Sequence, residues 1–303
     1  MPIRGKLGRP VDFVGVGHLA VDYRDGARLL GGAAAYACLT AARLGLSTAM
    51  VTAVGRDFDL FGPLEGIEIH YRQSGESTTF HNEYRDGERH QRLTGRALGI
   101  RVEDLAPIKS RLAEEAAVLY CPIAQEVEAP LSRLTRRGRC GVAPQGFLRR
   151  WDEDGTVRRC AWEGVAAAMT EVDLVSMSET DPSDVDLVNL VVLNRGLAGG
   201  KATLAITRGA HGARIYTKGY RSLVPAFERN VQDPTGAGDV FAAGFLVALR
   251  EGQEAIDAAQ FATCAASFAV ERVGVEGVPP SREAVEARLS EYRARHQPQE
   301  LEP

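Results

Sequence analysis

Apolar and polar positions alternate along the chain with two different periods, which predict strands and helices in turn. Residues 11–17 form a short apolar run closed by glycines, which is typical of a buried strand. An alanine-rich stretch at 33–44, ended by Gly45, predicts a helix, and residues 47–55 predict a second strand. Because a helix connects the two strands, this unit favours a parallel sheet.

The same pattern continues to the end of the chain. Further apolar runs predict buried strands at 116–122, 138–144, 171–178 and 202–209. Residues 187–197 predict a helix, and 212–219 and 221–227 predict antiparallel strands. Three successive helices are predicted at 238–252, 253–274 and 281–296. This order of elements predicts one α/β domain over residues 1–296, with a flexible tail at 297–303 that we expect to fray.

One segment departs from this pattern. Residues 69–94 are polar and alternate with period two, and Asp86-Gly87 lies between two such runs, as a tight hairpin turn requires. Faces this polar do not suit a central parallel strand. We therefore expect a small antiparallel β lid, reduced in size and inserted at about residues 66–95, with the short segment 19–30 beside it.

Composition and charge narrow the possible partners. The chain has 303 residues, of which 45% are hydrophobic and 25% charged, and a net charge of −4, which argues against nucleic-acid and membrane-surface partners. No window reaches the length of a membrane span and the first residues lack an apolar signal core, so we expect a cytoplasmic protein. The five cysteines lack C-x-x-C spacing and favour buried free thiols over disulfides or zinc.

The stretch DPTGAGD, from Asp233 to Asp239, precedes the first of the three C-terminal helices. The first amides of a helix have no partner within it, and the helix dipole adds partial positive charge there. With Gly236 and Gly238 allowing close approach, the amides from Gly236 through Ala237 to Asp239 are a candidate cradle for a phosphate. A carboxylate repels phosphate, so we interpret Asp239 as a base for an attacking hydroxyl. The alternative is an ordinary loop in which a side chain caps the helix.

The longer string DPTGAGDVFAAGF resembles the C-terminal signature of the PfkB, or ribokinase-like, family of sugar and nucleoside kinases. The resemblance extends over roughly residues 11–279. It implies a ribokinase-like three-layer α/β/α sandwich with a mostly parallel central sheet and a small β lid. It also implies transfer of the γ-phosphate of Mg-ATP to an alcohol of a small polyhydroxylated substrate, a sugar or a cyclitol.

The resemblance assigns further residues, for each of which a plain turn is the alternative. Asp22 matches an aspartate that holds substrate hydroxyls, and Gly31-Gly32 match a glycine pair that lies against the sugar. The string TRGAHGA resembles a T-x-G-x-x-G turn that lies along the nucleotide. It places ATP against three residues, Thr207, Gly209 and Gly212. Relatives also suggest that Asp233 sets its loop or a nearby monovalent cation site.

Two positions depart from the family's pattern. The string SETD, ending at Asp181, stands where the family often carries N-x-x-E for Mg²⁺ and phosphate, so Asp181 is the candidate metal residue, acting through water. Tyr36 stands near a position where many sugar kinases place asparagine, which indicates a different substrate wall or core packing. Gln145, after the C-terminal end of a predicted strand, is a further candidate for substrate contact.

Several questions stay open at this point. The lid sequence and DPTGAGD resemble the inositol-kinase branch more than ribokinase, with ribose, fructose, adenosine or a ketodeoxy sugar acid as other substrates and a monomer or a homodimer as the assembly. A non-catalytic small-molecule-binding homologue is one alternative function. An NAD-dependent oxidoreductase is another, because Gly15, Gly17 and Ala20 fit G-x-G-x-x-A. That pattern requires a helix directly afterwards, and residues 21–32 lack helical periodicity.

Overall fold

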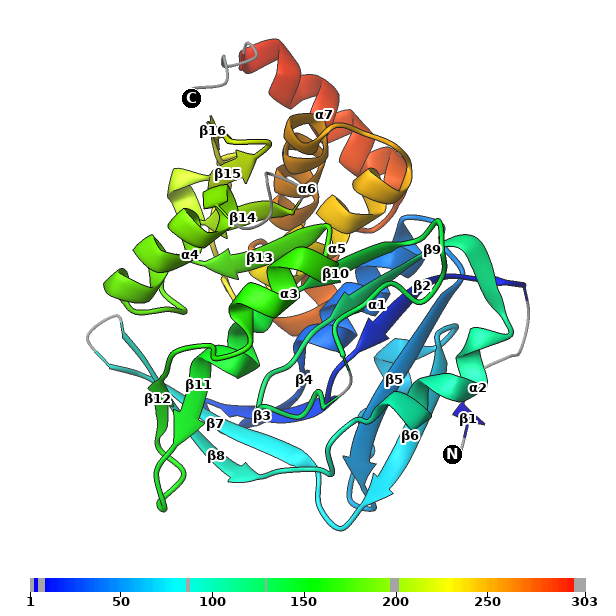
Figure 1. Cartoon of the computed structure of the whole chain (residues 1–303). Helices are drawn as coiled ribbons and strands as arrows, with labels where there is room; N and C mark the ends of the chain where they lie inside the picture. The colour runs from blue at the N-terminus through cyan, green and yellow to red at the C-terminus, as the bar shows by residue number, and fades with distance from the viewer. Residues whose placement is uncertain (1–2, 5–8, 86–87, 129, 197–201, 297–303) are drawn as a thin grey trace.

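The computed structural model describes residues 3–4, 9–85, 88–128, 130–196 and 202–296. Its centre is a ten-stranded sheet (Figure 1). The strands lie side by side in this order: β1 (Ile3–Arg4), β6 (Glu68–Ser74), β5 (Thr48–Gly55), β2 (Val11–Val16), β9 (Leu112–Tyr120), β10 (Arg139–Val142), β13 (Leu174–Ser178), β14 (Thr203–Thr207), β15 (Ala213–Thr217) and β16 (Tyr220–Val224). The strands from β6 to β14 are parallel, and the three outer strands pair antiparallel.

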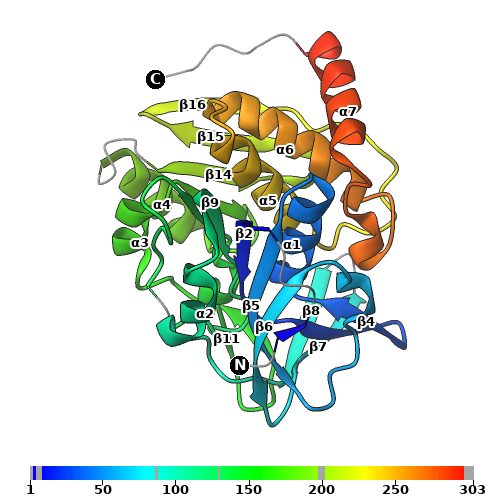
Figure 2. The same ribbon diagram turned by 90° about the vertical axis from the view of Figure 1, so that its right-hand side faces the viewer.

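Helices cover both faces of this sheet, as Figure 2 shows. One face carries α1 (Ala33–Arg43), α5 (Ala237–Arg250), α6 (Ala255–Ala269) and α7 (Arg282–Arg295). The other face carries α2 (Ala106–Lys109), α3 (Val165–Glu171) and α4 (Asp184–Gly196). Successive strand residues face opposite layers, so Phe13 lies in the first apolar core and Val14 in the second. The predicted three-layer α/β/α fold is therefore confirmed.

The helices and strands predicted from apolar patterns form at the expected places, with ends that differ by a few residues. The predicted crossover of strand, helix and strand is β2, α1 and β5, and the two strands pair in parallel. The antiparallel pair β15 and β16 is also present. Residue 197, the turn at 86–87 and the tail at 297–303 lie outside the described residues.

The lid is a separate four-stranded sheet. Its strands lie in the order β4 (Ala27–Gly31), β3 (Ala20–Arg24), β7 (Thr78–Arg85) and β8 (Glu88–Gly95). A short hairpin of β11 (Arg149–Trp151) and β12 (Val157–Arg159) extends it, because the Leu93 amide donates to the Gly155 carbonyl (2.9 Å). The segment after β2 thus forms two full lid strands. Since β3 and not a helix follows Gly15 and Gly17, the dinucleotide-binding pattern lacks the structure it requires.

The expected lid boundary at about residue 66 is wrong, because β6 belongs to the main sheet, where it pairs in parallel with β5. Three polar residues of β6 that the sequence indicated as lid residues, Glu68, His70 and Ser74, are buried. Glu68 is 5% exposed and accepts from Arg111 and from His70 Nε2, the latter at 2.6 Å. These charges are paired inside the protein, so a polar pattern here does not report an exposed strand.

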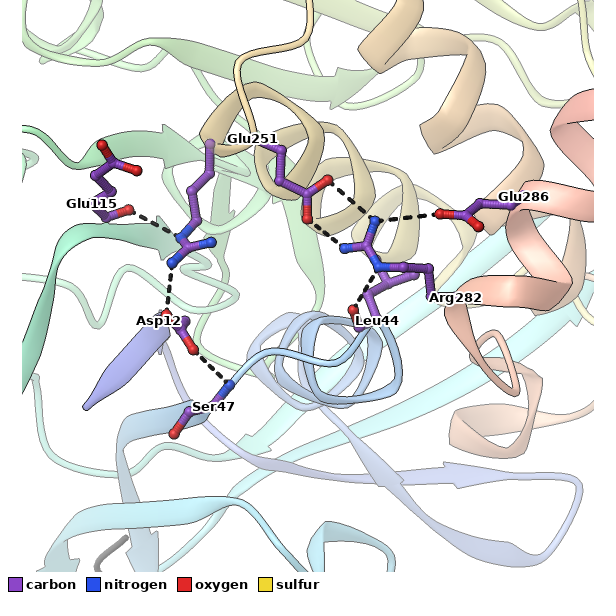
Figure 3. A network of polar contacts seen from close by, with 8 residues as sticks. Asp12, Leu44, Ser47, Glu115, Glu251, Arg282 and Glu286 are labelled. Carbon is purple, nitrogen blue, oxygen red and sulfur yellow. Dashed lines mark hydrogen bonds and ion pairs between the residues drawn. The ribbon is translucent and has the colours of Figure 1, made fainter. Parts of the chain in front are cut away.

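Charged side chains fix the C-terminal end of α5 (Figure 3). Arg250, the last residue of α5, bonds Asp12 Oδ1 through Nη2 (2.6 Å) and donates from Nε to the Glu115 carbonyl (3.0 Å). Asp12 Oδ2 in turn accepts from the Ser47 amide (3.1 Å). This end of α5 is thereby tied to the first residues of β2 and to the residues around β5 and β9.

A second arginine strengthens the same end of the molecule. Arg282, the first residue of α7, donates from Nε to the Leu44 carbonyl (3.0 Å) and pairs with Glu251 directly after α5 (Figure 3). Because α5 is a continuous helix, anchoring its C-terminal end also fixes where its N-terminal end lies. Among the described residues, no helix combines the length and the apolar character needed to cross a membrane.

Candidate active site

The N-terminal end of α5 presents backbone amides at the predicted cradle. Gly236 is the N-cap in a left-handed conformation (φ 80°), and the Val240 amide makes the bond to its carbonyl (2.9 Å). The amides of Gly238 and Asp239 precede that bond, whereas the Ala237 amide donates to the Pro234 carbonyl (3.3 Å). No side chain in the described part of the chain caps this end, so the alternative of a side-chain cap is wrong.

The two glycines of the cradle have different reasons to be glycine. A Cβ on Gly236 would lie 2.2 Å from the ring of Tyr36, and its φ is one that other residues rarely adopt. A Cβ on Gly238 would meet no described atom within 4 Å. The surface at Gly238 is therefore accessible to a ligand, while Gly236 is required by the protein's own packing against Tyr36.

Asp239 lies in the first turn of α5 and is partly exposed. Burial raises the pKa of the neighbouring Cys121 thiol well above its usual value, and the charge of Asp239 raises it further. Cys121 directly follows β9, and a Cβ on Gly17, directly after β2, would lie 2.3 Å from its carbonyl oxygen. Asp239 is thus near the carboxyl ends of two central parallel strands, where such sheets bind ligands.

A small pocket, partly open to solvent, lies between the lid and the main body. It is lined by Asp22, Arg24, Leu29, Leu30, Tyr36, Asn82, Asp233, Thr235 and Gly274. Asn82 Nδ2 donates to Asp22 Oδ1 (3.4 Å), and Gln91 Nε2 donates to Asn82 Oδ1 (2.9 Å). A Cβ on Gly31 would lie 2.1 Å from Asp22 Oδ2, so the Asp22 carboxylate needs glycine there.

The structure brings only some of the predicted substrate residues together. Asp22 and Tyr36 line the pocket. Gly32 is the N-cap of α1, and a Cβ there would lie 2.3 Å from the His18 carbonyl oxygen, so it shapes the backbone. Gln145 is not among the residues that line this pocket and instead donates from Nε2 to Asp181 Oδ1 (3.1 Å).

The residues predicted to bind the phosphoryl donor ATP lie together at the ends of β13 and β14. Thr207 Oγ1 donates to the Met177 carbonyl (3.3 Å), and the Glu179 amide donates to the Thr207 carbonyl (2.9 Å). The turn that follows closes between Gly209 and Gly212, with φ values of 54° and 79°. The turn and the SETD segment therefore form one surface.

Asp181 offers the carboxylate for a metal at this surface. Its Oδ2 accepts from the Ser178 amide (2.9 Å), and its Oδ1 accepts from Gln145. Mg²⁺ is usually held by one or two carboxylates together with water and substrate phosphates, so Asp181 fits a water-mediated role. Within the described ranges, no group of three or more His, Cys, Asp or Glu side chains is placed to hold a metal.

Asp233 lies in the pocket under the lid. It is 1% exposed, and its Oδ1 accepts from the Thr235 amide (3.0 Å) and from Arg24 Nη1 (2.7 Å), while Oδ2 accepts from the Gly274 amide (3.2 Å). Burial alone would raise the pKa of this carboxyl, but the hydrogen bonds outweigh burial and lower the pKa. Asp233 therefore stays ionised beside the lid.

Sequence reasoning missed three lid residues of this pocket region, Arg24, Asn82 and Gln91. Side chains two apart on a strand face the same side, so a strand prediction at residues 20–24, which the sequence analysis did not make, would have identified Arg24 from Asp22. The other two follow only from the register of β7 and β8, in which Asn82 and Gln91 are opposite each other.

The fold and the site together define an α/β/α sandwich with a lid over the carboxyl edge of its parallel sheet. The family described as pfkB family carbohydrate kinase matches residues 153–282, which include the donor turn and the cradle. A solved pyrophosphate-dependent kinase in the ribokinase family, complexed with a pyrophosphate analog and myo-inositol, has a TM-score of 0.72 at 23% identity, over 91% of this chain and 99% of that chain. The resemblance to the PfkB family that the sequence predicts is therefore confirmed over residues 153–282.

Two curated relatives resemble parts of the chain. A ribokinase from Bacillus subtilis (strain 168) is 41% identical over 100 residues, which are 33% of this chain and 34% of that protein. An inositol 3-kinase from Oryza sativa subsp. japonica is 29% identical over 265 residues, which are 83% of this chain and 65% of that protein. In both cases the match spans less than two thirds of the relative's own length.

Proposed function

We propose that this chain is a kinase that transfers a phosphoryl group from ATP to a hydroxyl of a sugar or a cyclitol. The observation that carries the proposal is the position of Asp239 in the first turn of α5, next to the accessible Gly238 and near the carboxyl ends of β2 and β9. The match of residues 153–282 to the pfkB family of carbohydrate kinases and the kinases among the relatives support the same reaction.

Each end of the site has a separate task in this proposal. Asp22 and Asn82, on lid strands β3 and β7, hold hydroxyls of the acceptor, and Asp239 takes the proton from the hydroxyl that attacks. The amides at Gly238 and Asp239 stabilise the negative charge that develops on the transferred group. The lid excludes water, which would otherwise compete as an acceptor.

The donor is bound at the other side of the cradle. The turn of Thr207, Gly209 and Gly212 lies along the nucleotide, and Asp181 holds Mg²⁺ through water with Gln145 as its hydrogen-bond partner. When bound, Mg²⁺ neutralises charge on the donor phosphates. Asp233 belongs to the acceptor side in this assignment, because it lines the pocket under the lid.

Within this reaction class we favour a cyclitol acceptor. The polar wall of the pocket has a carboxylate at Asp22 and an amide at Asn82, which Gln91 orients from behind. Such acceptor and donor groups suit a ring with hydroxyls on neighbouring carbons. The inositol 3-kinase, which matches 83% of this chain, supports the same choice.

The test is a matrix of donors and acceptors. ATP or pyrophosphate is incubated with myo-inositol, ribose, fructose or adenosine, and the product is identified by phosphorus NMR. We expect ATP with myo-inositol to give a phosphomonoester at the highest rate. Turnover with pyrophosphate but not with ATP would show that pyrophosphate is the phosphoryl donor. The proposed transfer to a hydroxyl would then still hold.

A folded protein that gives no phosphomonoester with any pair would contradict the kinase proposal. The same samples test the non-catalytic alternative by thermal unfolding. A stabilising shift with an acceptor, without product from any donor, would identify a small-molecule-binding homologue instead.

A further inference from the structure

The sequence resemblance implies that Asp233, whose carboxylate is buried, sets its loop or a nearby monovalent cation site. In this chain its two oxygens accept from three N–H donors, of which the amides of Thr235 and Gly274 are neutral and the guanidinium of Arg24 is charged. A monovalent metal ion needs oxygen ligands and negative charge. Here the negative charge of Asp233 is already balanced by a fixed positive charge at 2.7 Å, so the residues present do not fit a metal cation.

The pair joins two parts of the protein that are far apart in sequence. Arg24 is the last residue of lid strand β3, two positions after Asp22, and its side chain is 23% exposed. Asp233 begins the loop that leads into the cradle and is 1% exposed, and Gly274 lies in the turn after α6. Arg24 therefore joins the lid to the loop that leads into the cradle.

This arrangement points to a function for the pair in the reaction. A buried carboxylate that loses its cationic partner is strongly unfavourable, so the loop at Asp233 is most stable with Arg24 in place. A substrate hydroxyl bound to Asp22 holds the same strand that carries Arg24. Acceptor binding and the geometry of the cradle loop are thus linked through β3.

We propose that the guanidinium of Arg24 replaces a monovalent metal cation at the cradle loop, so that the reaction needs no added potassium or sodium. Arg24 is then a positioning residue: although it lines the pocket, its role in the reaction is to act on the cradle through Asp233. This inference rests on the proposed kinase function, but it also makes a prediction about cation binding that requires no turnover.

The activity test compares salts and variants with the full chain. Initial rates at saturating donor and acceptor are measured in tetramethylammonium chloride and in potassium chloride at equal ionic strength. We expect the wild-type rates to agree within about twofold, because a bound guanidinium leaves no cation site to fill. Arg24→Met should lower kcat by about tenfold or more with little change in KM, and potassium or guanidinium ions should restore part of it.

Two further variants separate this role from a general effect on the lid. Arg24→Lys keeps the charge and should retain more activity than Arg24→Met. Arg28→Met is the matched control, because Arg28 also lies in the lid but pairs with Asp59 and not with Asp233. A wild-type enzyme that potassium activates about tenfold, or an Arg24→Met enzyme with wild-type kcat, would overturn the inference.

Thermal unfolding gives a readout that is independent of activity. Potassium should leave the Tm of the wild-type protein unchanged relative to tetramethylammonium and should raise the Tm of Arg24→Met. A specific rise for the wild type, or no specific rise for the variant, would contradict the role of Arg24 even if no kinase activity were found. Absence of activity alone would count against the proposed function and not against this assignment.

Discussion

Tyr36 shows how one side chain can link the pocket under the lid to the candidate cradle at the start of α5. It lines the pocket under the lid, and its ring lies where a Cβ of Gly236 would be. The sequence left open whether Tyr36 is a substrate wall or part of the core. Tyr36 is 2% exposed and packs in the core, and it also borders the pocket, so its role as a substrate wall stays a prediction. A tyrosine here therefore requires glycine at 236.

The cysteines provide a prediction at the scale of single residues. Burial raises the pKa of Cys38 and of Cys264 to about 12, and Cys121 is buried as well. Cys160 is the most accessible cysteine, although burial also raises its pKa. Because the thiolate is the reactive form, iodoacetamide at mildly alkaline pH should modify Cys160 first in the native protein. Peptide mass spectrometry after timed quenching measures this order, and faster labelling of Cys121 would contradict the structure.

At the scale of elements, the lid is attached to the main sheet through a buried histidine. His18 lies between β2 and β3, its Nδ1 is 2.7 Å from Thr78 Oγ1 at the start of β7, and its Nε2 is 2.9 Å from the Leu98 carbonyl. Thr78 Oγ1 also accepts from the Ala97 amide (3.1 Å). The Leu98 carbonyl can only accept, so the neutral His18 donates to it from Nε2. Its Nδ1 then accepts from the Thr78 hydroxyl.

The neighbouring Glu126 completes the attachment of the lid. It is fully buried and accepts from the amides of His18 (2.9 Å), Ile123 and Ala124 (2.7 Å). These bonds fix the backbone where the chain leaves β2 for the lid. The backbone hydrogen bonds between the lid strands then hold these strands in register.

The attachment predicts how stability depends on pH. Burial lowers the pKa of His18 below the model-compound value of 6.5, so the unfolded chain binds a proton that the folded chain resists binding. The contribution of His18 to stability is complete above pH 6.5 and is lost as the pH falls below it, by at most about 1.4 kcal/mol per pH unit.

The measurement is urea unfolding of the wild type and of His18→Gln between pH 7.5 and pH 5. The free energy of unfolding of the wild type should fall more steeply on acidification than that of the variant. Equal slopes for the two proteins would show that His18 titrates normally in the folded state.

Element boundaries also show where sequence patterns are sufficient and where they are not. The parallel strands and the helices on their faces are continuous apolar runs or alanine-rich stretches, so their periodicity identifies them. For β6 the pattern fails, since Glu68 and His70 are polar but buried in pairs. The site behaves similarly: Asp22 and Asp239 are identified by motifs, whereas the contact between Arg24 and Asp233 depends on tertiary structure alone.

At the scale of the whole molecule, α5 extends from the carboxyl ends of the central parallel strands to the opposite end of the sheet. Its N-terminal turn holds Asp239, and its last residue, Arg250, bonds Asp12 and the Glu115 carbonyl. Nine consecutive residues between them, from 240 to 248, are buried. The helix is therefore held along its length and at its far end, which keeps the cradle in a fixed position relative to the sheet.

Removal of the far anchor should affect stability more than chemistry. Arg250 is largely buried, so Arg250→Ala leaves Asp12 and a carbonyl without their partner and should lower the free energy of unfolding by about 2 kcal/mol. Arg137→Ala is the control, since Arg137 pairs with exposed Glu114 and Glu115 and should change stability by less than about 0.5 kcal/mol. Chemical denaturation of both variants measures this, and equal effects would contradict the anchoring role.

The most direct test of the whole account is the turnover of Asp239→Asn. Asparagine has the same size but cannot take the hydroxyl proton, so kcat should fall by at least about two orders of magnitude. The KM for ATP and the Tm should stay near their wild-type values, because the cradle amides and the anchors of α5 are unchanged. A folded Asp239→Asn enzyme with nearly normal kcat would contradict the claim that Asp239 prepares the acceptor for transfer.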